Sequence, residues 1–72
     1  MVITQSMKIT INGEEKSFAS ELTITLLLEH LEIDTRKIAI EHNRQIVAKS
    51  TYTNTVINDG DQLEIVAFIG GG

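Results

Sequence analysis

Gly70, Gly71 and Gly72 are the residues of this sequence with the clearest chemical potential, and they directly follow an apolar run that begins at Leu63. Glycine has no side chain to pack and loses the most conformational entropy when it is ordered, so three consecutive glycines add little stability. We expect them to form a flexible thread, residues 70–72, that carries the α-carboxylate into a narrow active site on another protein. The carboxylate of Gly72 is therefore the predicted reactive group, with Gly71 next to it.

The rest of the chain has no residue pattern typical of an independent active site. It contains no cysteine, no glycine-rich phosphate loop and no serine–histidine–aspartate set. His30 and His42 have no neighbouring ligand in the sequence, so both are predicted to be plain surface residues. Asp59 and Asp61 flank Gly60, which favours a tight turn over a catalytic pair of carboxylates. A domain this small also leaves little room for a ligand pocket. We therefore predict a carrier, not an enzyme, with no metal and no cofactor bound by the chain itself.

Length and composition restrict the class of protein further. The 72 residues are enough for one domain. A net charge of −4, with only six Lys and Arg residues, argues against nucleic-acid binding, which needs a basic patch. No apolar run approaches the roughly 20 residues of a membrane span, and residues 1–6 lack the features of a signal peptide. We expect a monomer when free, in the cytoplasm, or in the plastid stroma if a plastid gene encodes it.

The first half of the chain predicts a hairpin and a helix. Met7–Ile11 alternates apolar and polar residues, Asn12-Gly13 is a strong signal for a type I′ turn, and Glu15–Ala19 returns as the second strand. Thr23 is the predicted helix cap. Apolar residues at helical spacing then form one buried face: Ile24, Leu27, Leu28 and Leu31. Leu26 falls outside this face, at the edge of the core or exposed.

The second half predicts two short strands, Ile38–Ile40 and Gln45–Ala48, and a long final strand, Gln62–Ile69. Ser50–Asn58 between them is predicted to be irregular, with one helical turn near Tyr52. The order of elements indicates an α+β fold: a mixed sheet of about five strands with one helix packed on one face. The domain is predicted to span residues 1–69, and residues 1–6 form an extension that is either a further strand or a frayed end.

The final strand predicts a surface for partner proteins. Alternation directs Leu63, Ile65, Ala67 and Ile69 toward the helix, and directs Glu64, Val66 and Phe68 to the open face of the sheet. An open face is normally polar, so Val66 and Phe68 indicate a docking surface that continues into Gly70. The alternative is that neighbouring strands or residues 1–6 cover them. Asp59, Asp61 and Glu64 are predicted to steer the chain to basic partners, or else simply to keep it soluble.

The same segments resemble the ThiS family, the sulfur carriers of thiamine biosynthesis. The resemblance extends from Met7 to Gly72, and its main parts are Met7–Gly13, Thr23–Leu31, Ile38–Glu41, Ile46–Val47, Asp59–Val66 and Ile69–Gly72. The departures from the family pattern are the extension at residues 1–6 and Leu26. The resemblance implies the β-grasp, or ubiquitin-like, fold.

The resemblance also implies a mechanism carried out by partner proteins. A ThiF-like adenylyltransferase would use ATP and Mg²⁺ to adenylate the Gly72 carboxylate. A cysteine desulfurase or another sulfur donor would convert the acyl adenylate to a thiocarboxylate, and a ThiG-like thiazole synthase would take the sulfur. Two alternatives stay open: the small subunit of molybdopterin synthase, whose tail usually carries a proline that this chain lacks, and a ubiquitin-like modifier of protein lysines.

Overall fold

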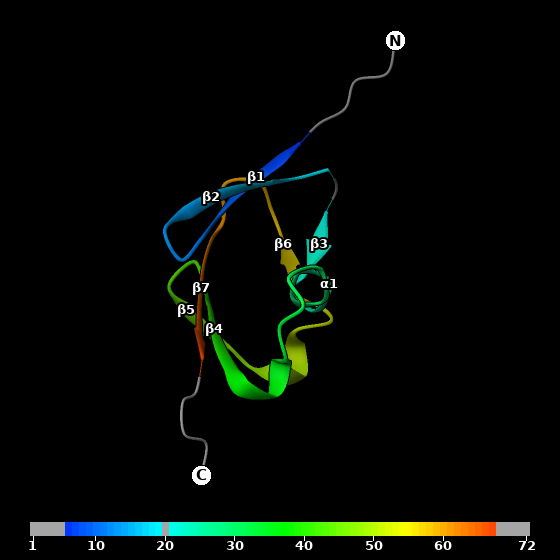
Figure 1. Cartoon of the computed structure of the whole chain (residues 1–72), viewed down its shortest axis with the longest axis vertical. Helices are drawn as coiled ribbons and strands as arrows, with labels where there is room; N and C mark the ends of the chain where they lie inside the picture. The colour runs from blue at the N-terminus through cyan, green and yellow to red at the C-terminus, as the bar shows by residue number, and fades with distance from the viewer. Residues whose placement is uncertain (1–5, 20, 68–72) are drawn as a thin grey trace.

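The computed structural model describes residues 6–19 and 21–67, and its main feature is a mixed sheet of five strands (Figure 1). The strand order is β2-β1-β7-β4-β5, with β1 and β7 parallel and the other neighbours antiparallel. The bounds are β1 Met7–Ile11, β2 Glu14–Phe18, β4 Ile38–His42, β5 Gln45–Val47 and β7 Gln62–Ala67. The last strand of the chain therefore lies in the middle of the sheet, between β1 and β4.

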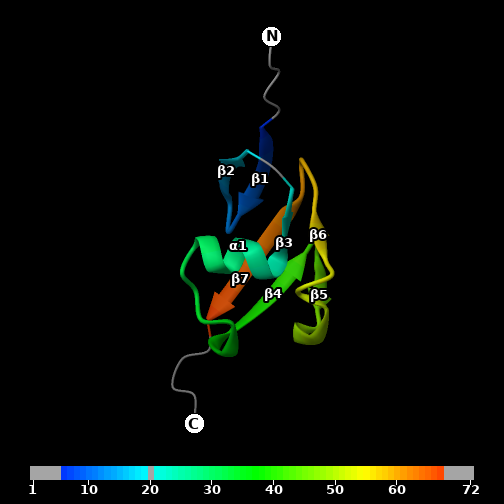
Figure 2. The ribbon, with the colours of Figure 1, turned by 90° about the vertical axis from the view of Figure 1, so that its right-hand side faces the viewer.

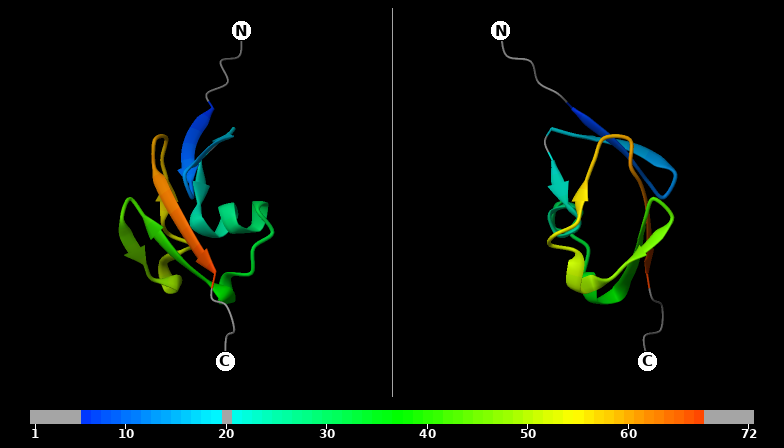
Figure 3. Two further views of the ribbon diagram at one scale, coloured as in Figure 1. Left: turned by 60° about the vertical axis from the view of Figure 1, so that its left-hand side comes forward. Right: turned by 180° about the vertical axis from the view of Figure 1, so that it is seen from behind.

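The helix α1, Ile24–His30, lies on one side of this sheet, as both views of Figure 3 show. It follows β3, Leu22–Thr23, which pairs with β6, Val56–Ile57, in a separate two-stranded sheet. Two 3-10 helices, η1 Thr35–Lys37 and η2 Lys49–Thr51, complete the connections. The predicted five-strand sheet with one helix on one face is confirmed. The β3–β6 pair was not predicted, because strands of two residues carry no periodicity.

Specific hydrogen bonds cap both ends of the helix α1. The Thr23 hydroxyl accepts a hydrogen bond from the Leu26 N–H at 3.2 Å, which confirms the predicted N-cap. At the other end Glu32 adopts a positive φ of 58°, and the Ile33 N–H donates to the Leu28 carbonyl at 3.0 Å. This is the Schellman arrangement of helix ends, with glutamate at a position where glycine is more common.

Two tight hairpins shape the sheet. Asn12 and Gly13 both have positive φ, 51° and 82°, as the predicted type I′ turn requires. Asn43 and Arg44 also have positive φ, 50° and 69°, so the β4–β5 connection has the same form. The sequence indicated a turn there but not its type, because arginine is an unusual residue at this position.

The core lies between the sheet and α1. Its largest fully buried side chains come from both layers: Ile9, Ile24, Leu27, Leu28, Ile40, Ile57 and Leu63. Tyr52, which follows η2, is 4% exposed and belongs to the same cluster. Leu26 was predicted to lie either at the edge of the core or on the surface. It is 49% exposed, so it lies on the surface. Among the described residues, no helix has the length and apolar character needed to cross a bilayer.

Candidate functional site

β7 is the element that leads to the predicted glycine tail, and it is held on both edges. β1 pairs with its first residues, Thr10 with Gln62 and Ile11 with Leu63. β4 pairs with it along most of its length, from Leu63 to Ala67. Phe68, Gly70, Gly71 and Gly72 lie outside the described residues, so their predicted roles stay predictions. What the structure shows is how firmly the strand before them is fixed.

Asn12 extends the β1–β7 pairing beyond the end of β1. Its backbone N–H donates to the Leu63 carbonyl at 2.9 Å. Its side-chain amide then exchanges two hydrogen bonds with Ile65: Nδ2 donates to the Ile65 carbonyl at 3.2 Å, and the Ile65 N–H donates to Oδ1 at 2.7 Å. The side chain thus acts as one more peptide unit along β7. The positive φ of Asn12, which its turn requires, lets the side chain reach back to the strand.

Asn43 holds the start of β7 in a comparable way. Its backbone N–H donates to the Gln62 carbonyl at 2.8 Å, and its Oδ1 accepts from the Gln62 N–H at 2.9 Å. Its Nδ2 donates to Asp61 Oδ1 at 3.1 Å. Two asparagines from two type I′ turns therefore fix β7 at successive points along its length. Sequence reasoning did not identify either contact, because the partners are far apart in the chain.

Asp61 is at the centre of a hydrogen-bond network at the start of β7. Its carboxylate accepts from the Asn58 N–H at 2.8 Å and from Asn43, and Oδ2 lies 2.6 Å from His42 Nε2. The side chains of His42 and Asp61 are only 18% and 13% exposed. The prediction that His42 is a plain surface residue is therefore wrong: the His42 ring pairs with a carboxylate 19 residues later in the chain.

These hydrogen bonds also control the charge of Asp61. Burial acts to raise the pKa of its carboxyl, but the hydrogen bonds from the Asn58 N–H, His42 and Asn43 outweigh it and hold the pKa below its usual value. Asp61 is thus a charged, well-bonded group of the fold. Its predicted role in steering partners stays a prediction, and the structure adds a role in positioning β7.

Asp59 connects the turn before β7 to β1. Its Oδ1 accepts from the Lys8 N–H at 2.7 Å, and the Gly60 N–H donates to the Lys8 carbonyl at 2.7 Å. Gly60 has a φ of 87°, a conformation that favours glycine, and the residues around it form the predicted tight turn. Asp59 and Asp61 therefore serve two different neighbours, β1 and β4, instead of facing one another as a catalytic pair would.

The open face of the sheet has an exposed apolar surface near the end of β7. Val66 is 54% exposed and Glu64 is exposed, as predicted for this face. Ile46 of β5 is 83% exposed, and it lies opposite Glu41, which in turn lies opposite Glu64. These residues form the open-face patch: Ile46, Val66, Glu41, Glu64 and Ala39, the partner of Val66. Sequence reasoning missed Ile46, although a β-branched apolar residue opposite a glutamate is a usable signal.

The helix-facing side of β7 becomes more exposed toward the end of the strand. Leu63 is 1% exposed and Ile65 is partly buried, but Ala67 is exposed. Ala67 pairs with the buried Ile38 and so lies on the predicted helix-facing side, but it is exposed because β7 continues past the level of α1 (Figure 2). The strand therefore leaves the cover of the helix before the chain reaches the predicted tail.

A groove on the helix side corrects another expectation. It has a volume of ≈ 590 Å³ and lies between β2 and α1, so the prediction of little room for a pocket is wrong. His30, which is exposed, lies at this groove with its ring edge-on to Phe18. Within residues 6–19 and 21–67, no three histidine or acidic side chains gather in a way that suits a metal ion.

Comparison with known proteins identifies the family. The model of the ThiS family matches residues 3–72. The chain belongs to the ThiS family. It is 32% identical over 63 residues to the sulfur carrier protein ThiS of Bacillus subtilis, a match that covers 86% of this chain and 96% of that protein. The resemblance stated from the sequence is thereby confirmed.

A solved ThiS structure and a larger relative add to the comparison. The crystal structure of the thiamine biosynthesis protein ThiS from Geobacter metallireducens superposes with a TM-score of 0.81 at 30% identity, covering 92% of this chain and all of that one. The fold is therefore the β-grasp of ThiS proteins. A thiazole synthase of Paramagnetospirillum magneticum is 56% identical over 66 residues; the match covers 92% of this chain but only 20% of that protein. The chain thus spans a fifth of the length of this relative.

Proposed function

We propose that this ThiS-family chain carries sulfur for thiazole formation in thiamine biosynthesis, as a thiocarboxylate on Gly72. The observation that carries the proposal is the family match over residues 3–72, which includes the glycine end. The geometry agrees with it. β7 is fixed by Asn12 and Asn43 on opposite edges, so the residues that follow it start from a defined place on the head of the molecule.

The chemistry needs an activated carboxylate. A free carboxylate resists nucleophiles, because it is negatively charged and has no good leaving group. In the first of the proposed reactions, a ThiF-like adenylyltransferase transfers AMP from ATP to the Gly72 carboxylate and releases pyrophosphate, with Mg²⁺ offsetting the charge on the phosphates. A sulfur donor such as a cysteine desulfurase then supplies a persulfide, whose terminal sulfur attacks the acyl carbon and expels AMP. A thiol reductant cleaves the resulting acyl disulfide and releases the thiocarboxylate, so that sulfur replaces the carboxylate oxygen that left with AMP. Glycine at 71 and 72 offers no Cβ that could collide with a narrow channel.

The open-face patch is the proposed docking surface for these partners. Ile46 and Val66 supply exposed apolar area, and Glu41 and Glu64 lie beside them with negative charge. Apolar residues surrounded by charge are typical of surfaces that bind proteins. A partner with an apolar centre and basic residues around it would fit. Phe68 and Gly70 follow β7 in the sequence and are proposed to extend this contact.

The thiazole synthase relative supports the identity of one partner. In Paramagnetospirillum magneticum, a segment similar to this chain is part of a single protein named thiazole synthase. Proteins that act on each other directly are often found joined in one chain, so we propose that a ThiG-like synthase receives the sulfur from this chain. A location in the cytoplasm or plastid stroma stays a prediction.

Complementation tests the proposed function against its alternatives. Expression in a bacterial strain that lacks its own ThiS should restore growth without thiazole. Restored molybdenum-cofactor activity in a strain that lacks the small subunit of molybdopterin synthase, without rescue of the thiazole requirement, would instead support the second candidate. Isopeptide adducts on lysines of other proteins would support a ubiquitin-like modifier.

A further inference from the structure

Asn12-Gly13 is the only asparagine–glycine pair in the sequence, and both residues are exposed in the turn of the β1–β2 hairpin. Asparagine is a chemically labile residue. The backbone nitrogen of the following residue can attack its side-chain carbonyl carbon, and a glycine there has no side chain to obstruct the attack. The Gly13 N–H bonds to no described residue. The attacking nitrogen is therefore free, and water has access to the reacting groups.

The fold restrains the other reacting group, the side chain of Asn12. Its Nδ2 donates to the Ile65 carbonyl at 3.2 Å, and its Oδ1 accepts from the Ile65 N–H at 2.7 Å. In a type I′ turn the first central residue has a ψ of about +30°, which directs the following nitrogen away from its Cβ. Ring closure needs that nitrogen and Cβ on the same side. The reaction therefore requires a local opening in which Asn12 leaves both the turn conformation and Ile65.

The β4–β5 hairpin provides an internal comparison. Asn43 occupies the same turn position, with a φ of 50°, and its Oδ1 also binds β7, at the Gln62 N–H. The residue after it is Arg44, whose side chain obstructs ring closure. Arg44 has a φ of 69°, so this turn position accepts a side chain, and a Cβ added at Gly13 would meet no heavy atom within 4 Å. Of these two asparagines, only Asn12 precedes a residue that leaves it reactive.

Asp59-Gly60 is a related pair that the fold protects more fully. Asp59 Oδ1 accepts from the Lys8 N–H, and the Gly60 N–H donates to the Lys8 carbonyl, both at 2.7 Å. β1 thus holds the side chain and the attacking nitrogen together. A carboxylate also lacks the leaving group that an amide has. Asn12 is therefore the site where one restraint, the contact with Ile65 in the turn, separates the chain from reaction.

We propose that Asn12 is a site of non-enzymatic deamidation, which begins when its side chain separates from Ile65 and which then prevents their contact from re-forming. The Gly13 nitrogen gives its proton to a base in the solvent and attacks Cγ of Asn12. The new C–N bond closes a succinimide ring, the Cγ–Nδ2 bond breaks, and Nδ2 leaves as ammonia with a proton from water. Water then opens the ring at either carbonyl, giving aspartate or isoaspartate at this position.

Both products alter the contact between the first hairpin and β7. Aspartate has acceptor oxygens and no donor, so a carboxylate oxygen would face the Ile65 carbonyl that Nδ2 had bonded. In isoaspartate the backbone runs through the former side chain and gains one atom, so neither bond can re-form in its original geometry. β7 would keep its pairing with β1 and β4 but lose the contact beyond the end of β1. The strand that leads to the predicted tail would then be less firmly fixed.

Peptide mapping by mass spectrometry tests the site. The full chain is incubated at mildly alkaline pH, either folded or in urea, and the deamidated fractions at Asn12 and Asn43 are followed with time. Asn12 should react at least about tenfold faster in urea, because opening the folded state breaks two hydrogen bonds. Asn43 should stay intact over the same period. Equal rates in the two conditions would overturn the control by Ile65, and equal conversion of Asn43 would overturn the site.

Gly13→Arg is the matched variant, because it copies the Asn43-Arg44 turn. Gly13→Asn takes its place if the arginine variant does not fold, since asparagine tolerates a positive φ. After the same incubation of folded protein, amide exchange at Ile65 should be about tenfold faster in the deamidated wild type and unchanged in the variant.

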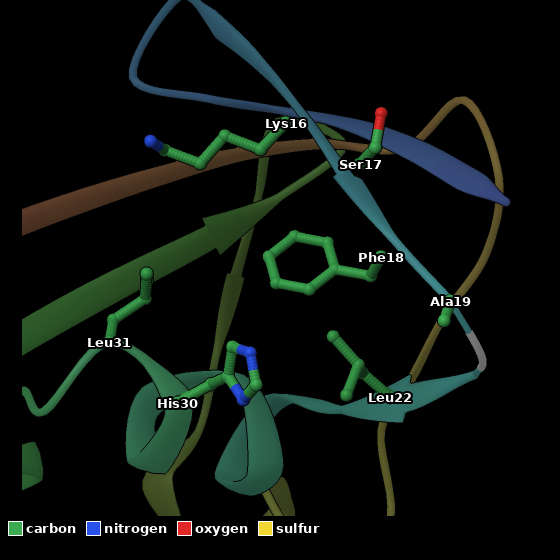
Figure 4. Close-up of a pocket in the computed structure, with 7 residues that line it drawn as sticks. All are labelled: Lys16, Ser17, Phe18, Ala19, Leu22, His30 and Leu31. Carbon is green, nitrogen blue, oxygen red and sulfur yellow. The ribbon is translucent and has the colours of Figure 1, made fainter.

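Phe18 provides the internal control for exchange. It pairs with Met7 at the other end of the hairpin, where Figure 4 shows its ring directed toward Leu22 and His30. Its exchange rate should not change. Unchanged exchange at Ile65 in wild-type chains deamidated at Asn12 would overturn the effect on β7, and the same loss of protection in the incubated variant would do so too.

Discussion

The side-chain amide of Asn12 and the backbone of Ile65 exchange two hydrogen bonds, of 3.2 and 2.7 Å, across 53 positions of the chain. The residue that forms the first hairpin turn thereby fixes the strand that leads to the predicted reactive end. A peptide-like pairing of this kind replaces a pair of backbone bonds that β1 is too short to make. The fold of the first hairpin and the position of the last strand thus depend on one asparagine.

Replacing Asn12 should loosen β7. Asn12→Gly keeps the positive φ but removes both side-chain bonds, so we expect a loss of about 1–3 kcal/mol in the free energy of unfolding. Asn12→Ala should cost about 1 kcal/mol more, because alanine resists a positive φ. Urea denaturation measures both values. Faster amide exchange at Ile65 in the glycine variant would locate the effect, and unchanged exchange there would contradict it.

Asp61 should make the fold sensitive to acid. Its pKa is lowered in the folded protein, so its contribution to stability is present above the unfolded pKa of about 3.9 and is lost as pH falls through the lower, folded value. In Asp61→Asn this contribution should be missing at every pH. We expect that variant to lose about 1–3 kcal/mol at neutral pH and less at low pH.

Urea denaturation at neutral pH and at pH values below about 4 measures this difference. Glu64→Gln is the matched control, since Glu64 is exposed on the open face. A stability gap between Asp61→Asn and the wild type that stays constant down to the lowest pH would contradict the proposed role of the charge.

Tyr52 should tolerate the loss of its hydroxyl. The side chain is buried, and its hydroxyl makes no well-formed hydrogen bond with any described residue, although the backbone of Ile40 is near. Burial raises the pKa of the phenol despite that contact. Tyr52→Phe should therefore be neutral or stabilising by about 1 kcal/mol, whereas Tyr52→Ala should lose about 3–5 kcal/mol of unfolding free energy. A large loss in Tyr52→Phe would reveal a hydrogen bond that the static geometry lacks.

The first hairpin and the helix were predictable from the sequence, because Asn12-Gly13 and Thr23 act on their immediate neighbours. The five-strand sheet followed from the order of elements and the family resemblance. The contacts that position β7 were not predictable: Asn12 with Ile65 and His42 with Asp61 join residues far apart in the chain, and asparagine or histidine alone does not name a distant partner. The groove beside Phe18 also depends on how β2 and α1 pack together.

The open-face patch should affect partner binding without affecting stability. Ile46→Asp and Val66→Asp change residues that are 83% and 54% exposed, so unfolding free energy should change by less than about 0.5–1 kcal/mol. Affinity for a ThiF-like activating enzyme should fall about tenfold or more if these residues are central to the contact. Titration calorimetry with that enzyme measures it.

Leu26→Asp is the control for this experiment. Leu26 is 49% exposed on the helix, on the other side of the sheet from the patch. Its replacement should leave the affinity unchanged. If all three variants bind the enzyme as tightly as the wild type, the open face is not the docking surface.

The central claim is that Gly72 becomes a thiocarboxylate. Intact-mass spectrometry after incubation with an active ThiF-like enzyme, ATP, Mg²⁺ and a sulfur donor tests it most directly. We predict a gain equal to the exchange of one oxygen for sulfur, located at Gly72 by fragmentation, and no gain when one residue is added after Gly72 in a chain that still folds. An unchanged mass with an enzyme that converts a known ThiS protein, or the same gain in the extended chain, would contradict the account.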